Sequence, residues 1–256
     1  MAEGNIIVAV DHAIDVIEFL FRAKQEASIS EISAATGMAN SSIHRQLLTL
    51  KERGYIYQNP ETLKYWLGMR FYAIGNLVKK QLPLVTILAP ALDALAEKYG
   101  LTTYLAIPDF SSDLCAQQAI IYKKNCCPMM LRNEVSVGTV LVSHASATGK
   151  CMLAYYPTSQ IEKYSKHPLL RLTEKTITDW DALRAECSSI RSRGYALDSE
   201  EELVGRTCLA VPVINSQSEI VASISLSGQT KSIFEHPVNE IVEDLYRVAR
   251  IATAKM

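Results

Sequence analysis

The sequence predicts an α+β protein in two parts, a small and mostly helical N-terminal part and a larger C-terminal part of strands and helices. Up to about residue 82, apolar residues recur mainly at helical spacing, with one short strand-like stretch. From Leu84 onward, strand-like runs are mixed with helical stretches, which is typical of an antiparallel sheet flanked by helices. At 256 residues the chain is long enough for two domains.

Three helices are expected in the first 54 residues. Apolar residues at helical spacing over 10–21 predict the first, with one apolar stripe. Ser30 is expected to cap the second helix and Gly37 to end it. Asn40 is expected to cap the third, which Gly54 ends. The second and third helices, joined by a tight turn, have the pattern of a helix-turn-helix.

A short hairpin is expected after these helices. Residues 55–58 and 64–67 read as strands joined by turn residues at 59–62. A helix-turn-helix followed by such a ribbon is a winged helix-turn-helix, which lays one helix in the DNA major groove. Residues 40–70 carry five basic and two acidic side chains, whereas residues 4–39 carry two basic and five acidic ones. The basic charge therefore lies on the expected DNA-facing part, although the whole chain has a net charge of −1.

Candidate DNA contacts fall on the third helix and the hairpin, where hydroxyls and hydrogen-bonding side chains suit phosphates and base edges. Arg45 lies near a helix N-terminus, where the helix dipole disfavours a cation, so an external anion would account for it. The alternative, an ordinary solvated helix charge, is less favoured for Arg45 and stays open for Lys51. The expected major-groove contacts are Ser41, Ser42, His44 and Arg45, and the expected backbone or wing contacts are Lys51, Lys64 and Tyr65.

The rest of the chain reads as a connector followed by the sheet domain. Residues 69–81 are helical in pattern, and Phe71, Ile74 and Val78 could pair with a second subunit. We expect a DNA-binding domain over residues 1–68, a linker or dimerisation helix over 69–82 and the sheet domain over 83–256. Within the last, a helix is expected from Leu84 to Gly100, strands at 102–107, 117–122, 208–214 and 219–227, and helices at 146–156, 158–165, 179–193 and 238–254.

Several classes of protein are disfavoured. No apolar run reaches the roughly 20 residues of a membrane span, and the N-terminus lacks the basic start of a secretory signal. Six cysteines without C-x-x-C spacing and five scattered histidines predict neither disulfides nor a metal, and we expect no cofactor and a cytoplasmic protein. The ATGKC segment at 147–151 is not a phosphate loop, because His144 and Cys151 stand where that motif needs Gly and Ser or Thr.

Four segments resemble the IclR family of bacterial transcriptional regulators, in the family's order and over essentially the whole chain. The resemblance implies a winged helix-turn-helix, a dimerising linker helix and a GAF-like domain that binds a small effector. It also implies double-stranded operator DNA of pseudo-palindromic sequence as partner, bound by homodimers or dimers of dimers. The four segments are GMANSSIHRQLLTLKERGYI, SHASATGKCMLAY, RGYALDSEEELVGRTCLAVPV and ASISLSG.

The resemblance also implies an effector pocket. Its Asp, Cys and two Ser around an apolar wall would suit a small carboxylate or sugar acid, and such ligands are typically carbon-source metabolites in this family. Thr148 and Cys151 depart from the small apolar residues that the family often has at these positions. The implied pocket residues are Met130, Ala147, Thr148, Asp198, Cys208, Ser225 and Ser227.

Two rival functions remain at this point. An enzyme could use Cys208, His144 and Asp198 as a nucleophilic triad, but no elbow glycines surround Cys208, and buried cysteines usually only pack, so we do not expect an enzyme. The helix-turn-helix could instead dock a partner protein. Ser225 and Ser227 could, without the resemblance, be the exposed face of an edge strand.

Overall fold

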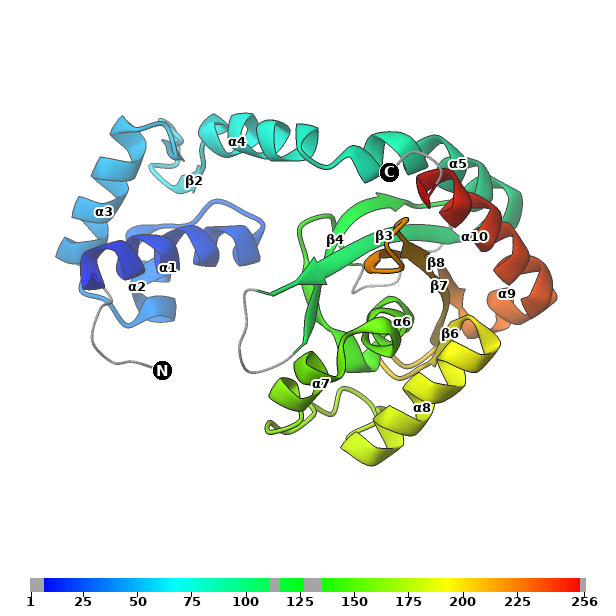
Figure 1. The fold of residues 1–256 in the computed structure, drawn as a ribbon. Coiled ribbons are helices and arrows are strands. Elements are labelled where there is room, and N and C mark those ends of the chain that lie inside the picture. Colours follow the sequence, from blue (N-terminus) through cyan, green and yellow to red (C-terminus); the bar gives the residue numbers. More distant parts are fainter. Residues whose placement is uncertain (1–6, 111–115, 127–134, 254–256) are drawn as a thin grey trace. The chain divides into compact units, whose positions relative to one another are not determined.

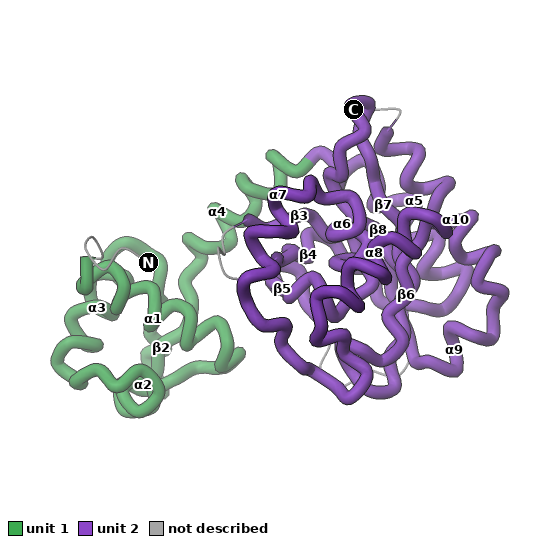
Figure 2. Tube along the Cα trace, turned by 60° about the horizontal axis from the view of Figure 1, so that its bottom comes forward, with its two compact units in different colours: residues 1–82 green, residues 83–256 purple. Residues whose placement is uncertain are grey.

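The computed structural model of the chain describes residues 7–110, 116–126 and 135–253. The chain divides into two compact units, residues 1–82 and residues 83–256 (Figure 2). Met130, one of the expected pocket residues, lies outside the described residues. Among the described helices none is long and apolar enough to cross a membrane.

The N-terminal unit is a winged helix-turn-helix, which confirms the prediction from the sequence (Figure 1). Apolar residues on its first three helices point to one shared core, which the wing closes. The core side chains with no exposed surface are Val16, Leu20, Ile32, Ile43 and Leu47. The elements are α1 (Val8–Ala23), α2 (Ile29–Thr36), α3 (Asn40–Glu52), β1 (Ile56–Gln58), β2 (Tyr65–Leu67) and α4 (Met69–Lys80).

Helix α2 begins two residues earlier than its predicted cap implies. Ser28, and not Ser30, occupies the cap position, and its hydroxyl accepts from the Glu31 backbone N–H at 3.3 Å. The Glu31 carboxylate in turn accepts from the Ser28 backbone N–H at 2.7 Å. This reciprocal capping box needs a hydroxyl and a carboxylate three positions apart, a spacing that Ser30 lacks. Gly37 ends the helix as predicted, with a φ of +72°.

Helix α3 and the wing show one further difference from the prediction. Asn40 is the first helical residue, and Ala39 occupies the cap position without any side-chain hydrogen bond, so the prediction of Asn40 as cap is wrong. The wing turns where the sequence predicts: the Asn59 side-chain oxygen accepts from the Glu61 backbone N–H at 2.9 Å. The Asn59 amide also donates to Glu26 at 2.9 Å, which anchors the wing to the segment before α2.

The C-terminal unit is a curled antiparallel sheet in the order β5-β4-β3-β8-β7-β6. Helices α5 and α10 pack on one face and α6 on the other, with α8 beyond α6 (Figure 1). This is the sheet flanked by helices that the sequence predicts. The strands are β3 (Thr102–Asp109), β4 (Gln117–Lys124), β5 (Val140–Val142), β6 (Ala196–Ser199), β7 (Arg206–Ile214) and β8 (Ile220–Gln229); the helices are α5 (Pro83–Tyr99), α6 (Ala147–Tyr155), α7 (Thr158–Tyr164), α8 (Trp180–Arg193), α9 (Thr230–Phe234) and α10 (Val238–Thr253).

The start of α6 is fixed by a close approach of two backbone segments. Ser146 caps the helix by accepting from the Gly149 backbone N–H at 3.2 Å. A Cβ atom on Gly149 would lie 2.3 Å from the Ser143 carbonyl oxygen, so only glycine allows the helix to pack this closely on the short 3-10 turn at residues 143–145. This contact sets where α6 meets the sheet.

Candidate DNA-binding and effector sites

The exposed face of α3 carries the expected major-groove residues. Ile43 and Leu47 are fully buried, which turns the opposite side of the helix outward. On that side Ser41, His44 and Arg45 are exposed. Within the described residues, Arg45 makes no ion pair, so its charge is available to a phosphate or a base edge. Ser42, the fourth expected contact, is half-buried.

The residues expected to contact the DNA backbone or to act from the wing differ in their exposure. Lys51 donates to the Gln58 side chain at 2.8 Å, and Lys64 lies 3.5 Å from the Glu31 carboxylate. Both are surface interactions that a phosphate could replace. Tyr65 is different, because it is only 7% exposed and packs in the core of the unit. Its backbone is already paired with Ala27, so the structure does not place Tyr65 on a DNA-facing surface.

The expected effector residues of the sheet share one face. In the strand register Cys208 lies opposite Ser227 on one side and opposite Asp198 on the other. Ser225 lies opposite Tyr104 of β3. Because side chains alternate along a strand, these positions point toward α6. All of them are buried, so the alternative that Ser225 and Ser227 are the exposed face of an edge strand is wrong.

A small cavity of about 20 Å³, room for about one water molecule, lies between this face and the start of α6. Of the expected residues, Thr148, Cys208, Ser225 and Ser227 line it. Asp198 and Ala147 are fully buried beside it without lining it. The other lining residues, which the sequence reasoning missed, are Tyr104, Ile120, Val135, Leu141, Ser146, Glu202 and Arg206.

Asp198 holds the loop behind the cavity. Its Oδ1 atom accepts from the Glu201 backbone N–H at 2.7 Å and from the Glu202 N–H at 3.4 Å. Its Oδ2 atom is buried and has no hydrogen-bond partner in the described part of the chain. Burial raises the pKa of Asp198 to about 7, against the opposing effect of the hydrogen bond from Glu201.

This pKa makes the stability of the C-terminal unit depend on pH. An unfolded aspartate loses its proton near pH 4, whereas Asp198 in the folded chain keeps it to about pH 7. Through that window the folded state binds more protons, so the free energy of unfolding contributed by Asp198 falls as pH rises. We expect Asp198→Asn to flatten this dependence and to unfold at higher urea than the wild type at pH 8. Urea unfolding at pH 5 and pH 8 tests this. The matched control is Asp181→Asn, because the side chain of Asp181 is 92% exposed.

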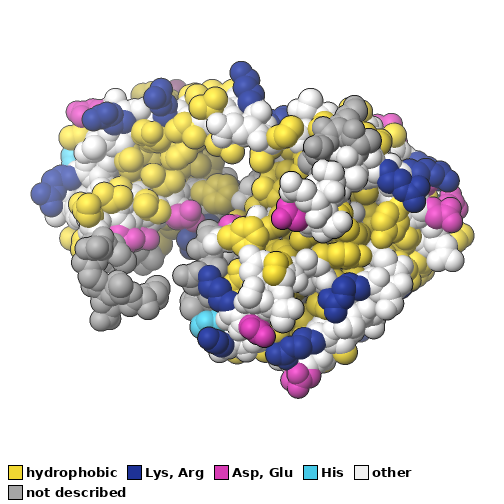
Figure 3. Space-filling view, viewed as in Figure 1, with side chains coloured by type: hydrophobic (Ala, Val, Ile, Leu, Met, Phe, Trp, Pro, Cys, Tyr) yellow, Lys and Arg dark blue, Asp and Glu magenta, His cyan; other side chains and the backbone are white. Residues whose placement is uncertain are grey.

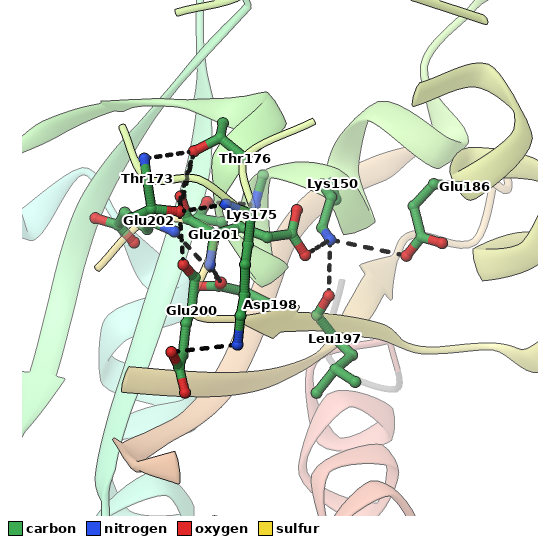
Figure 4. A network of polar contacts seen from close by, with 12 residues as sticks. Lys150, Thr173, Lys175, Thr176, Glu186, Leu197, Asp198, Glu200, Glu201 and Glu202 are labelled. Atoms are coloured by element: carbon green, nitrogen blue, oxygen red, sulfur yellow. Dashed lines mark hydrogen bonds and ion pairs between the residues drawn. The ribbon is translucent and has the colours of Figure 1, made fainter. Parts of the chain in front are cut away.

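A buried lysine ties α6 to the same loop. Lys150 has a side chain only 1% exposed, and its Nζ atom lies 2.5 Å from the Glu201 carboxylate. It also donates to the Leu197 carbonyl oxygen at 2.7 Å and lies 3.8 Å from Glu186 (Figure 4). Thr176 adds a hydrogen bond of 2.7 Å to the Glu201 carbonyl oxygen. The loop between β6 and β7, which carries Glu202, is thus held from several sides.

The residues of the imagined nucleophilic triad are poorly suited to catalysis. Burial raises the pKa of Cys208 to about 12, so its thiol stays protonated at neutral pH. Burial lowers the pKa of His144, whose Nε2 atom lies 2.8 Å from the Leu170 carbonyl oxygen. The described residues also contain no group of three or more His, Cys, Asp or Glu side chains placed to hold a metal ion.

Both units of the chain are similar to known proteins. Residues 9–60 match the IclR helix-turn-helix domain, and residues 77–253 match the C-terminal domain of bacterial transcriptional regulator IclR. The HTH-type transcriptional regulator XynR of Escherichia coli K12 is 30% identical over 247 residues, which cover 94% of this chain and 93% of XynR. The transcriptional repressor IclR of the same organism is 27% identical over 248 residues, 96% of this chain and 89% of IclR.

Solved structures show the same fold. An IclR transcriptional regulator from Alicyclobacillus acidocaldarius superposes with a TM-score of 0.81 at 24% identity, over 97% of this chain and 98% of the other. An IclR homologue from Microbacterium hydrocarbonoxydans, complexed with 4-hydroxybenzoate, superposes with a TM-score of 0.82 at 21% identity, over 96% and 98%. Together with the matches to both domains, which extend over more than half of the chain, the conclusion is direct: the chain belongs to the IclR family of bacterial transcriptional regulators.

Proposed function

We propose that this chain regulates transcription by binding a pseudo-palindromic operator through α3. Ser41, Ser42, His44 and Arg45 enter the major groove, and Lys51 and Lys64 contact the DNA backbone. The observation that carries this proposal is the outward face of α3, where exposed Arg45 has no ion-pair partner among the described residues. A DNA phosphate or base acceptor would give this unpaired guanidinium a partner.

The working form of the protein is a homodimer or a dimer of dimers. Helix α4 has no buried residue, although apolar side chains lie along it. Figure 3 shows hydrophobic side chains gathered on the N-terminal unit. Exposed apolar patches of this kind mark association surfaces in soluble proteins. The exposed apolar side chains of α4 are Met69, Tyr72, Ile74, Leu77 and Val78.

The effector is a small metabolite with a carboxylate, such as a hydroxy acid or a sugar acid, bound at the cavity beside α6, which must widen to admit it. Hydroxyls of Thr148, Ser225 and Ser227 supply hydrogen bonds, and Ile120 and Leu141 supply the apolar wall. The 4-hydroxybenzoate complex of the Microbacterium relative supports a ligand of this class. The effector shifts the protein between two arrangements to the extent that it binds one of them more tightly.

The protein acts in the cytoplasm, where operator DNA lies, and it performs no chemistry on its effector. A protonated, buried thiol at Cys208 supports binding rather than nucleophilic attack. Turnover of a metabolite that is lost in Cys208→Ala would support the enzyme alternative instead.

Selection from random duplex DNA with the purified full chain tests the proposal. We expect enrichment of a sequence with two related half-sites, spaced by one helical turn or a multiple of it. The selection is run without ligand and again with a pool of small metabolites, because some regulators bind only with effector. A folded protein that enriches no sequence in either selection contradicts the proposal.

A further inference from the structure

A charged pair forms one wall of the effector cavity. Arg206, the first residue of β7, is buried with 6% of its surface exposed, and its Nη2 atom lies 2.9 Å from the Oε2 atom of Glu202. Both side chains line the cavity, next to Cys208, Ser225 and Ser227. The cavity thus contains a positive and a negative group in direct contact.

The guanidinium of Arg206 has more donors than partners. Arginine carries five N–H donors, and buried donors are normally all hydrogen-bonded. Among the residues that the structure describes, Glu202 is the one side chain with which the guanidinium makes a polar contact. The Ser225 hydroxyl, fully buried in the same cavity, also has no hydrogen-bond partner within the described ranges. Donor groups from two adjacent strands therefore meet in one cavity and suit an acceptor that carries negative charge.

Glu202 limits how strongly an anion can use these donors. Its carboxylate already neutralises Arg206, and Asp198 lies just behind it, with its Oδ1 atom 3.4 Å from the Glu202 backbone nitrogen. An incoming carboxylate must share Arg206 with Glu202 or displace it. Glu202 thus neutralises the charge of Arg206 and also competes with an incoming anion for the guanidinium.

We propose that Arg206 is the specificity-determining residue for an anionic effector, and that the effector's carboxylate competes with Glu202 for its guanidinium. This rests on the effector site proposed above. The two substitutions then have opposite effects: Arg206→Gln removes the binding partner of the carboxylate, whereas Glu202→Gln removes its competitor. A pair that only stabilised the fold would weaken binding in both variants.

Calorimetric titration of the full chain with lactate, gluconate and 4-hydroxybenzoate, each beside its neutral amide, tests the proposal. We expect at least one carboxylate to bind about tenfold or more tightly than its amide, as hydrogen bonds to charged groups are worth that much. Arg206→Gln loses this preference, and Glu202→Gln binds the same carboxylate several-fold more tightly. Arg247→Gln, which removes an exposed cation paired with Asp244 on α10, leaves all affinities unchanged.

Three results would overturn the assignment: no binding of any of the three carboxylates, equal binding of a carboxylate and its amide, or weaker binding in both variants. Thermal unfolding of each variant shows that it is folded at the titration temperature. The titration contains no DNA, so its outcome is independent of the operator selection. A chain that enriches no DNA but prefers a carboxylate through Arg206 contradicts the proposed regulator and leaves this inference intact.

Discussion

Replacing Lys150 by methionine is expected to lower the free energy of unfolding of the C-terminal unit by about 3–5 kcal/mol. The substitution keeps the apolar stem and removes the charge that lies 2.5 Å from the Glu201 carboxylate. Glu201 then remains buried without its cation, and one of its carboxylate oxygens already lacks a hydrogen-bond partner among the described residues. Because burial raises the pKa of Glu201, it takes up a proton more readily, and the loss shrinks toward acid pH. Urea unfolding at pH 8 and pH 5 measures both effects.

Lys175→Met is the matched control for this prediction. Lys175 also pairs with a carboxylate of the same loop, at 3.3 Å from Glu200, but its side chain is 57% exposed. Exposed pairs contribute about 0–1 kcal/mol, so this variant stays close to the wild type. The double variant Lys150→Met, Glu201→Gln removes both charges and recovers part of the lost stability. Equal losses in Lys150→Met and Lys175→Met would show that the buried pair does not hold the loop.

Arg45→Ala is expected to reduce specific operator binding to the level of non-specific DNA binding. A side chain that reads a base edge contributes about 1–3 kcal/mol of discrimination. A symmetric dimer carries Arg45 twice, so the loss is incurred at both half-sites. The N-terminal unit keeps its fold, because Arg45 is exposed and contributes nothing to the core. Fluorescence anisotropy with the selected operator measures the affinity.

Arg22→Ala controls for the loss of one positive charge from the same unit. Arg22 is exposed on α1 and pairs with Glu18 at 3.2 Å. We expect its operator affinity to lie within a few-fold of the wild type, since screened surface charges act weakly. Unchanged operator affinity in Arg45→Ala would remove Arg45 from the mechanism and leave Lys51 and Lys64 as the principal contacts.

Local periodicity explains why much of the fold could be predicted. Apolar spacing predicts α1, α3 and α4, cap and stop residues predict α2, and alternation by two places Ser225 and Ser227 on one face. Strands β5 and β6 and helix α9 are three to five residues long, too short for a period to appear, so the sequence does not predict them. The face of a three-residue strand such as β2 is equally hard to read, which is why Tyr65 was expected at the surface.

The effector site was predictable in its strands and not in its loop. Arg206 lies two residues before Cys208 on the same strand, so the alternation that places Ser225 and Ser227 on the cavity face also identifies Arg206. Glu202 has no such signal in a run of acidic residues. It reaches the cavity only because residues distant in sequence hold the loop between β6 and β7. The contact that spans the most sequence is that of Lys150 with Glu201, 51 residues apart.

The most direct test of the regulator proposal is the affinity of the selected operator, compared with a scrambled duplex of the same composition, at several salt concentrations. We predict that the operator binds much more tightly than the scrambled duplex. We also predict that both affinities fall steeply as salt rises, because phosphate contacts release counterions. Equal affinity for the two duplexes, or an affinity that does not change with salt, would contradict DNA recognition through α3 and favour a protein partner for the winged helix.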